Sequence, residues 1–131
     1  MKKSGLFNSH LAAVTAQMGH FDTITVADAG LPIPPDVQRI DLVVSRGIPA
    51  FIEVVRALLA ELVVQEAIIA EEMVVASPAL YAELRSALGE IPVRCVPHET
   101  FKQQTRASRA VVRSGEFTAY ANVILVSGVA F

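Results

Sequence analysis

Short apolar runs alternate along this chain with segments in which apolar residues recur at helical spacing. Six runs are predicted to form strands: Thr23–Ala27, Ile40–Val44, Val63–Ala70, Ile91–Val96, Ala110–Arg113 and Asn122–Ser127. Four segments are predicted to form helices: Asn8 to Met18, Ala50 to about Leu62, Ser77 to Gly89, and Pro97 to Ser108. This alternation predicts an α/β fold with one mostly parallel central sheet flanked by helices.

Capping residues and helix breakers set the boundaries of these elements. Asn8 is a good N-cap for the first helix, and Gly19 is predicted to end that helix in a left-handed conformation. Ser77–Pro78 combines an N-cap with a first-turn proline. The segment Asp28–Pro35 contains three prolines and a glycine, so it can be neither helix nor central strand. We expect an ordered loop there.

The composition adds an expectation about assembly. The length of 131 residues indicates a single domain, residues 1–131. Hydrophobic residues make up 53% of the chain and charged residues 18%, which is an apolar composition for a small monomer. We therefore expect a sheet covered on both faces, and a homo-oligomer that buries further apolar surface. The single cysteine, Cys95, is predicted to lie in the core and fits a reducing, cytoplasmic compartment.

Several classes of function are disfavoured by what the chain lacks. Its net charge of −2 gives no basic footprint for nucleic acid. Its apolar runs are far shorter than the ~20 residues of a membrane helix, and the start MKKSGLFNSH has no apolar core of a secretory signal. No glycine loop for a nucleotide phosphate is present, and the histidines and cysteine lack zinc-site spacing. We expect neither a cofactor nor a metal.

His20 is the first candidate for chemistry. It follows the end of a predicted helix, where the partial negative charge favours a protonated imidazole. Asp22 would point to the same side if the chain is extended there, and a carboxylate would orient the imidazole for acid/base work near neutral pH. A surface histidine that caps the helix explains the spacing equally well.

Polar residues also follow the predicted strands, at the edge where ligands collect in such sheets: Asp28, Glu71, Pro97–His98 and Ser114–Gly115. Asp28 could bind sugar hydroxyls or act as a base, although an Asx-turn with its own loop is the commoner use. His98 and Lys102 lie one helical turn apart at a helix start, which suits an oxygen-rich ligand or simply an exposed polar face.

Tyr120 and Asn122 flank the start of the last predicted strand. An aromatic plane and an amide would suit a sugar ring and its hydroxyls, whereas the plainer use of both residues is packing and turn bonding. Imidazoles, carboxylates and amides without a cofactor can bind a polyol and move protons.

Several longer motifs carry a family resemblance. The segments MGHFDTITVADAGLPIP, RIDLVVSRGIPAF, EAIIAEE, PHETFKQQT, RSGE and YANVILVSGVAF together resemble the ribose pyranase and fucose mutarotase family. The resemblance covers essentially the whole chain, from MKK to the terminal phenylalanine. DAGLPIP and FKQQT point to the ribose branch.

The resemblance implies an enzyme that interconverts the pyranose and furanose forms of β-D-ribose by acid/base-catalysed ring opening, and so feeds ribose to phosphorylation. It implies a ring-shaped homo-oligomer, a decamer of two stacked pentamers, with the sugar near a subunit boundary. The family's proton-donating histidine falls on His20. Its sugar-binding residues fall on Asp28, His98, Tyr120, Ala121 and Asn122, with Lys102 as a further contributor. The general base stays open between Asp28, His98 and a bound water.

Two other functions remain open at this point. One is a mutarotase for L-fucose or a related sugar, which shares the same class of chemistry. The other is a ribose-binding ring without catalysis.

Overall fold

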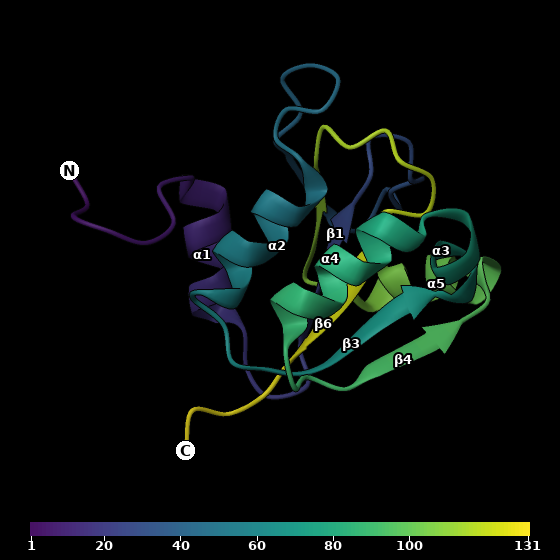
Figure 1. Ribbon diagram of the computed structural model, residues 1–131. Helices are drawn as coiled ribbons and strands as arrows, with labels where there is room; N and C mark the ends of the chain where they lie inside the picture. Colours follow the sequence, from purple (N-terminus) through teal and green to yellow (C-terminus); the bar gives the residue numbers. More distant parts are fainter.

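The computed structural model describes residues 1–131 and shows alternating helices and strands (Figure 1). The helices are α1 (Ser9–Gln17), α2 (Phe51–Leu59), α3 (Glu71–Ala76), α4 (Pro78–Leu88), α5 (His98–Gln104) and the 3-10 turn η1 (Thr105–Ala107). The strands are β1 (Thr23–Ala27), β2 (Gln38–Asp41), β3 (Val64–Ala70), β4 (Val93–Val96), β5 (Ala110–Arg113) and β6 (Val123–Ser127).

All strands belong to one sheet, in the order β2-β5-β1-β6-β3-β4. β1 and β2 are parallel to β5, and β3 is parallel to β4. β6 is antiparallel to both of its neighbours, β1 and β3. The prediction of an α/β fold with a mostly parallel sheet is confirmed. The reversed β6 also begins at the edge of the sheet where the five other strands end.

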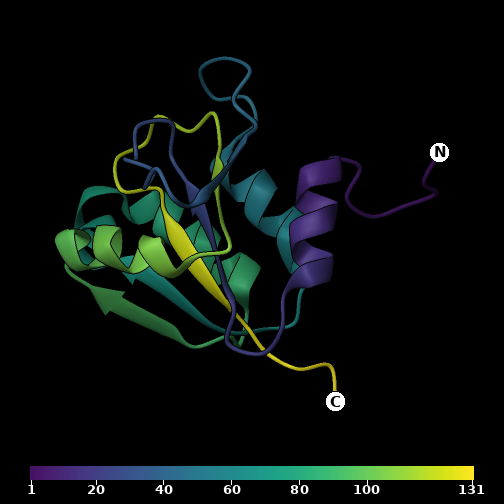
Figure 2. The same cartoon turned by 180° about the vertical axis from the view of Figure 1, so that it is seen from behind.

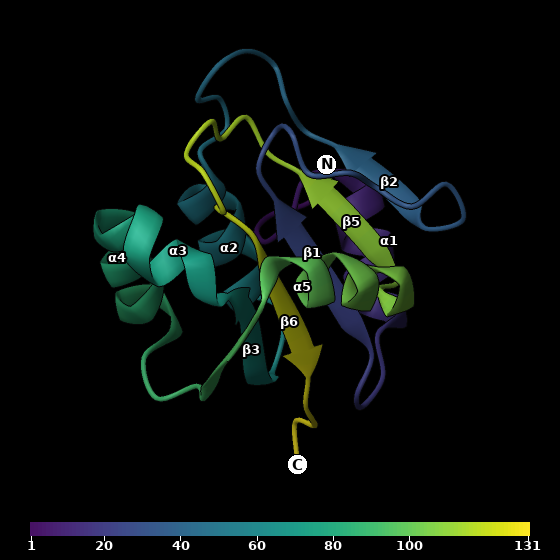
Figure 3. The same cartoon turned by 90° about the vertical axis from the view of Figure 1, so that its right-hand side faces the viewer.

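Helices cover both faces of the sheet, as expected from the apolar composition. Figure 3 shows α5 across one face, with α1, α2 and α4 behind the other. The larger core joins Val14, Phe51 and Leu84 of those three helices to strand residues such as Val26 and Leu125. The smaller core packs Phe101 of α5 against residues of the opposite face: Ala27, Leu31, Ile68, Ala70, Val96, Val111, Ile124 and Val126.

Some predicted boundaries were wrong, and strand pairing explains one of them. The second strand is Gln38–Asp41 rather than Ile40–Val44, because its partner β5 spans only four residues, in the register Gln38↔Ala110 to Asp41↔Arg113. Val44 lies beyond that pairing and is 80% exposed. The fourth strand begins only at Val93.

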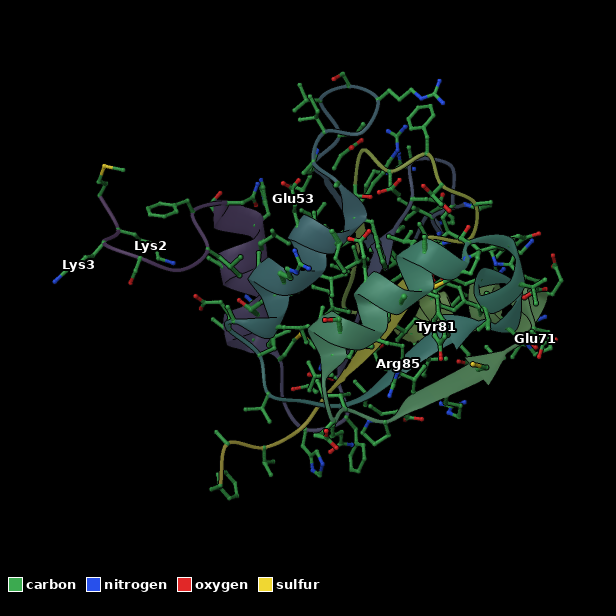
Figure 4. The ribbon with its side chains drawn as sticks, viewed as in Figure 1. Lys2, Lys3, Glu53, Glu71, Tyr81 and Arg85 are labelled. Carbon is green, nitrogen blue, oxygen red and sulfur yellow. The ribbon has the colours of Figure 1, made fainter.

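The helices differ from the predictions at their ends. α2 ends at Leu59 and α5 at Gln104, where the 3-10 turn follows. The acidic pair after β3 opens a helix that was not predicted, α3, and Figure 4 shows its first residue, Glu71, beside the ends of β3 and β4. The Asn8 carboxamide caps α1 as expected, by accepting from the backbone N–H of His10 and Leu11.

Two local predictions were also wrong. The chain turns after α1 at Phe21, whose φ is 68°, and the helix already ends at Gln17 with an extended Met18, so Gly19 is not its left-handed terminus. Cys95 is exposed rather than buried, because it lies in the edge strand β4.

None of the helices has both the length and the apolar character needed to cross a membrane.

Candidate active site

The carboxyl edge of the sheet brings together the residue after β1 and the residue before β6. The backbone N–H of Asp28 donates to Oδ1 of Asn122 at 2.9 Å, and Nδ2 of Asn122 donates to Oδ2 of Asp28 at 2.9 Å. Asn122 is fully buried. This reciprocal pair, the Asp28–Asn122 clamp, fixes the position of a half-buried carboxylate at the edge where the sequence predicted a site.

Asp28 also orders the loop that follows it. Its Oδ1 accepts the N–H of Gly30 at 2.9 Å, which is the Asx-turn considered in the sequence. Ala29 donates its N–H to the Glu116 carbonyl at 2.8 Å and accepts Nε of Arg113 at 2.9 Å. The Asx-turn use of Asp28 is therefore seen, and the second carboxylate oxygen binds Asn122, whereas contact of Asp28 with a sugar hydroxyl stays a prediction.

His98 and Tyr120 meet at the same edge. Their ring centroids are 5.0 Å apart and the planes are nearly perpendicular, at 82°. Nδ1 of His98 is buried and has no hydrogen-bond partner. Buried polar atoms are rarely left unpaired, so this nitrogen has capacity for one further hydrogen bond.

A carboxylate that sequence reasoning missed holds His98 in place. Both oxygens of Glu72 accept the backbone N–H of His98, at 3.1 and 3.0 Å, and so cap the start of α5. The signal for this residue was the acidic pair directly after a buried strand, in the segment EAIIAEE.

The segment before β6 has an unusual backbone. Tyr120 has a φ of 60°, a left-handed conformation that is uncommon for an aromatic residue. Ser77 donates its hydroxyl to the carbonyl of Ala119 at 2.7 Å, so it supports this turn instead of capping α4 as predicted. Ala121 is fully buried, so the single chain exposes no part of this residue to a ligand.

Two hollows open beside these residues. One, of about 330 Å³, is lined by Asp28, by the last residue of β5, Arg113, and by the loop that follows: Glu116, Phe117, Thr118 and Ala119. The other lies between Tyr120 and the exposed side of α3 at Glu71, Glu72 and Val75. Both are large enough to admit a monosaccharide, and the clamp and the Tyr120 ring lie at their margins.

Glu116, in the RSGE motif, is a second carboxylate that sequence reasoning missed. It accepts the N–H of Phe51 at 3.2 Å and both the N–H and the hydroxyl of Thr118, at 3.2 and 2.7 Å. Burial alone would raise the pKa of Glu116, but these hydrogen bonds together outweigh burial and lower it. Glu116 thus stays ionised and ties the loop after β5 to the start of α2.

Lys102 is not brought into this group. Its Nζ pairs with Glu99 Oε1 at 2.6 Å, and hydrogen bonding to Lys102 lowers the pKa of Glu99. Lys102 lines a separate groove between α5 and the prolines of the 32–35 loop. The predicted pairing of Lys102 with His98 as one ligand-binding face is therefore not seen in the single chain.

His20 lies at the opposite edge of the sheet from Asp28. The strand β1 separates them and is about 13 Å long at ~3.3 Å per residue. Figure 2 shows the turn before β1 beside the C-terminal tail, whereas the loops after β1 and β5 gather at the other end. One copy of the chain cannot place His20 and Asp28 against the same sugar ring.

The environment of His20 also differs from the prediction. Asp22 does not orient the imidazole, because the left-handed Phe21 turns the chain and Asp22 instead accepts the N–H of Gly19 at 2.8 Å and pairs with Arg109 at 3.0 Å. The Gly19 hydrogen bond and then Arg109 lower the pKa of Asp22. The partner of His20 is Gln65, with Nε2 2.9 Å from Oε1. The sequence feature that could have identified Gln65 is a polar residue in an otherwise apolar run.

Comparison with known proteins agrees with the resemblance found in the sequence. Residues 1–130 match the family described as the RbsD / FucU transport protein family. A D-ribose pyranase of Coprothermobacter proteolyticus is 56% identical, with 100% of both chains aligned. A D-ribose pyranase of Geobacillus kaustophilus is 48% identical, and the match covers 100% of this chain and 96% of that protein.

Solved structures share the fold. Bacillus subtilis RbsD complexed with D-ribose superposes with a TM-score of 0.97 at 44% identity, over 100% of both chains. The fucose mutarotase of Streptococcus pneumoniae in complex with L-fucose gives 0.81 at 24% identity, over 99% of this chain and 100% of that one. The full-length match in sequence and fold leads to one conclusion: this chain belongs to the RbsD / FucU transport protein family.

Proposed function

We propose that this protein is a ribose pyranase, an isomerase that interconverts the β-pyranose and β-furanose forms of D-ribose. The observation that carries the proposal is the carboxyl-edge cluster, in which the Asp28–Asn122 clamp lies on the same edge as the unpaired Nδ1 of His98. Full-length relatives named D-ribose pyranase support the substrate. The furanose product would then be consumed by phosphorylation.

The reaction requires two proton transfers. Ring opening of the hemiacetal removes the proton of the anomeric hydroxyl, breaks the bond from the anomeric carbon to the ring oxygen, and protonates that oxygen. Closure from another hydroxyl of the free aldehyde reverses these steps and gives the other ring size. Positioned acid/base groups contribute on the order of 10²–10⁴ to such a step, which suits a reaction that already proceeds slowly unaided.

The residues divide these tasks. Asp28 and Tyr120 bind the sugar, and the buried residues Ala121 and Asn122 support this wall, Asn122 by holding the Asp28 carboxylate. Nδ1 of His98 is free to accept from or donate to a hydroxyl, so His98 or Asp28, or a water between them, removes the anomeric proton. His20 is the acid for the ring oxygen. Lys102 contributes from the neighbouring groove, once released from Glu99.

We further propose that each site is built from two copies of the chain, since His20 and Asp28 lie at opposite edges of the sheet. Exposed apolar side chains on the monomer support association: Phe21 is 67% exposed, Val75 85% and Phe117 59%. Copies joined head to tail in this way form a ring when the rotation between neighbours closes, as in the decamer of two pentamers implied by the resemblance. The free, exposed Cys95 fits a reducing, cytoplasmic compartment.

Saturation-transfer NMR on D-ribose tests the activity. Added protein should increase exchange between the β-pyranose and β-furanose signals, and His20→Ala should abolish this exchange while ribose still binds. Exchange with L-fucose but not with D-ribose would replace the proposal by the mutarotase alternative. Ribose binding without added exchange would leave a ring that binds the sugar and does not catalyse.

A further inference from the structure

The side chain of Gln65 reaches His20 because the strand that carries it is irregular. The pairing of β3 with β6 shifts register between Val64 and Glu66, so Gln65 is the extra residue of a β-bulge. Bulges redirect side chains and occur often beside active sites. Here the redirected amide oxygen lies 2.9 Å from Nε2 of His20.

A second irregularity presents the imidazole to that oxygen. Phe21 has a φ of 68°, an uncommon backbone conformation for an aromatic residue, and its ring stacks on His20 with a centroid distance of 3.8 Å. The turn is fastened to the end of β6, because Phe21 donates its N–H to the Ser127 carbonyl at 2.9 Å. His20 is therefore held between an aromatic plane and the Gln65 amide.

Gly128, the residue directly after β6, leaves room for the side chain of Gln65. An added Cβ at Gly128 would lie 3.3 Å from Cβ of Gln65 and 3.5 Å from its Oε1, closer than most real contacts of this kind at the first of these atoms. Gly128 also donates its N–H to the Val63 carbonyl at 2.8 Å, which fixes the strand just before the bulge. The bulge, the left-handed turn and this glycine together bring one amide oxygen against one imidazole nitrogen.

An amide oxygen can only accept a hydrogen bond, so it requires a proton on Nε2 of His20. We propose that Gln65 is a positioning residue that fixes His20 as the Nε2–H tautomer and presents Nδ1 to the sugar. The proposal rests on the proposed role of His20 as the acid.

With this tautomer, the proton transfers at His20 balance in both directions of the reaction. The imidazolium donates Nε2–H to Gln65 throughout, and its Nδ1 proton moves to the ring oxygen as the bond from the anomeric carbon breaks. The neutral ring that remains is the tautomer that Gln65 stabilises, and its bare Nδ1 takes the proton back from the hydroxyl that closes the new ring. The amide carries no charge, so it orients the ring without trapping it as the cation.

The test combines a measurement of the tautomer with one of the rate. Labelled histidine gives ¹³Cδ2 and ¹⁵N shifts that report the tautomer, and His20→Asn assigns the signal among the three histidines. Wild-type protein should show His20 as Nε2–H. Gln65→Leu should weaken this preference and lower kcat for ribose exchange about tenfold or more, with KM little changed. Gln65→Glu, which keeps an acceptor, should restore the tautomer.

The matched control is Gln38→Leu, which removes an exposed glutamine from the distant edge strand β2 and should change neither readout. A wild-type His20 that carries its proton on Nδ1 would overturn the proposal, as would a Gln65→Leu variant with unchanged tautomer and kcat. Wild-type protein with the Nε2–H tautomer but no ribose exchange would overturn the proposed function while supporting the tautomer assignment.

Discussion

Asn122 uses its carboxamide to hold a carboxylate rather than to cap a turn. One end accepts the Asp28 N–H and the other donates to the Asp28 carboxylate, in a fully buried position. Only an amide offers an acceptor and a donor at these two places. The orientation of the proposed sugar anchor therefore depends on a neutral side chain at residue 122.

Asn122→Asp replaces the donor by a second carboxylate facing Asp28. We expect the free energy of unfolding at pH 7 to fall by about 3 kcal/mol, because like charges meet in a buried position and a hydrogen bond is lost. Asn122→Ala, which adds no charge, should lower the free energy of unfolding by a smaller amount. Chemical denaturation at pH 7 and pH 4 checks this, since the aspartate variant should recover at acid pH when the pair shares a proton. Equal losses in the two variants at both pH values would contradict the account.

Glu116 gives a prediction about acid stability. The pKa of Glu116 is lowered from its ordinary value of 4.5 in the folded protein. Its ionised form therefore adds to the free energy of unfolding above pH 4.5, and this stabilisation is lost as the pH falls through the folded-state pKa. Glu116→Gln should be less stable than wild type at pH 7, and its melting temperature should decline less below about pH 4.5. Glu90→Gln, at an exposed glutamate without a hydrogen-bonding partner, should follow the wild-type curve. A Glu116→Gln curve parallel to wild type would contradict the assignment.

At the scale of elements, the loop before α2 is fastened to the loop after β5. Gly47 donates its N–H to the Gly115 carbonyl at 2.6 Å, and Gly115 donates to the Pro49 carbonyl at 2.8 Å. Figure 1 shows the first of these loops projecting beyond the carboxyl edge of the sheet. A Cβ at Gly115 would overlap the backbone of Ile48, so only glycine permits this approach.

Gly115→Ala should therefore separate the two loops. We expect a loss of about 1–3 kcal/mol in the free energy of unfolding, as for other overpacked sites, together with a raised KM for ribose because Glu116 follows directly. Gly30→Ala is the control for stability, since a Cβ there makes only an ordinary 3.6 Å contact with Asp28. Circular dichroism melts and saturation-transfer kinetics measure the two effects. Equal stability of the two variants would show that the contact is not needed.

The order and type of most elements could be predicted from the local sequence, because β-branched runs and helical spacing indicate which residues are buried. The strand Thr23–Ala27 and the helix after Ser77–Pro78 are examples. The end of β2 could not be predicted from the sequence, because the length of its partner strand β5 limits it. The partner of His20 was not readable either, since the bulge at Gln65 exists only in the pairing with β6.

At the scale of the whole molecule, the site residues identified from the sequence divide between two edges of one sheet. Asp28, His98, Tyr120 and Asn122 gather at the carboxyl edge, because the reversed β6 begins where β1 and β3 end. His20 lies at the far end of β1. A pattern along the chain could suggest each residue but not this separation, which requires the directions of the strands.

The most direct test of the account mixes two inactive variants. His20→Ala and Asp28→Asn should each abolish exchange between ribose pyranose and furanose, because each removes one half of every site. Refolded together in equal amounts, they should form hybrid assemblies in which about one quarter of the sites carry both native residues, so exchange should return to about that fraction of the wild-type rate. A mixture that stays inactive, although native mass spectrometry shows hybrid assemblies, would contradict a site built from two copies of the chain.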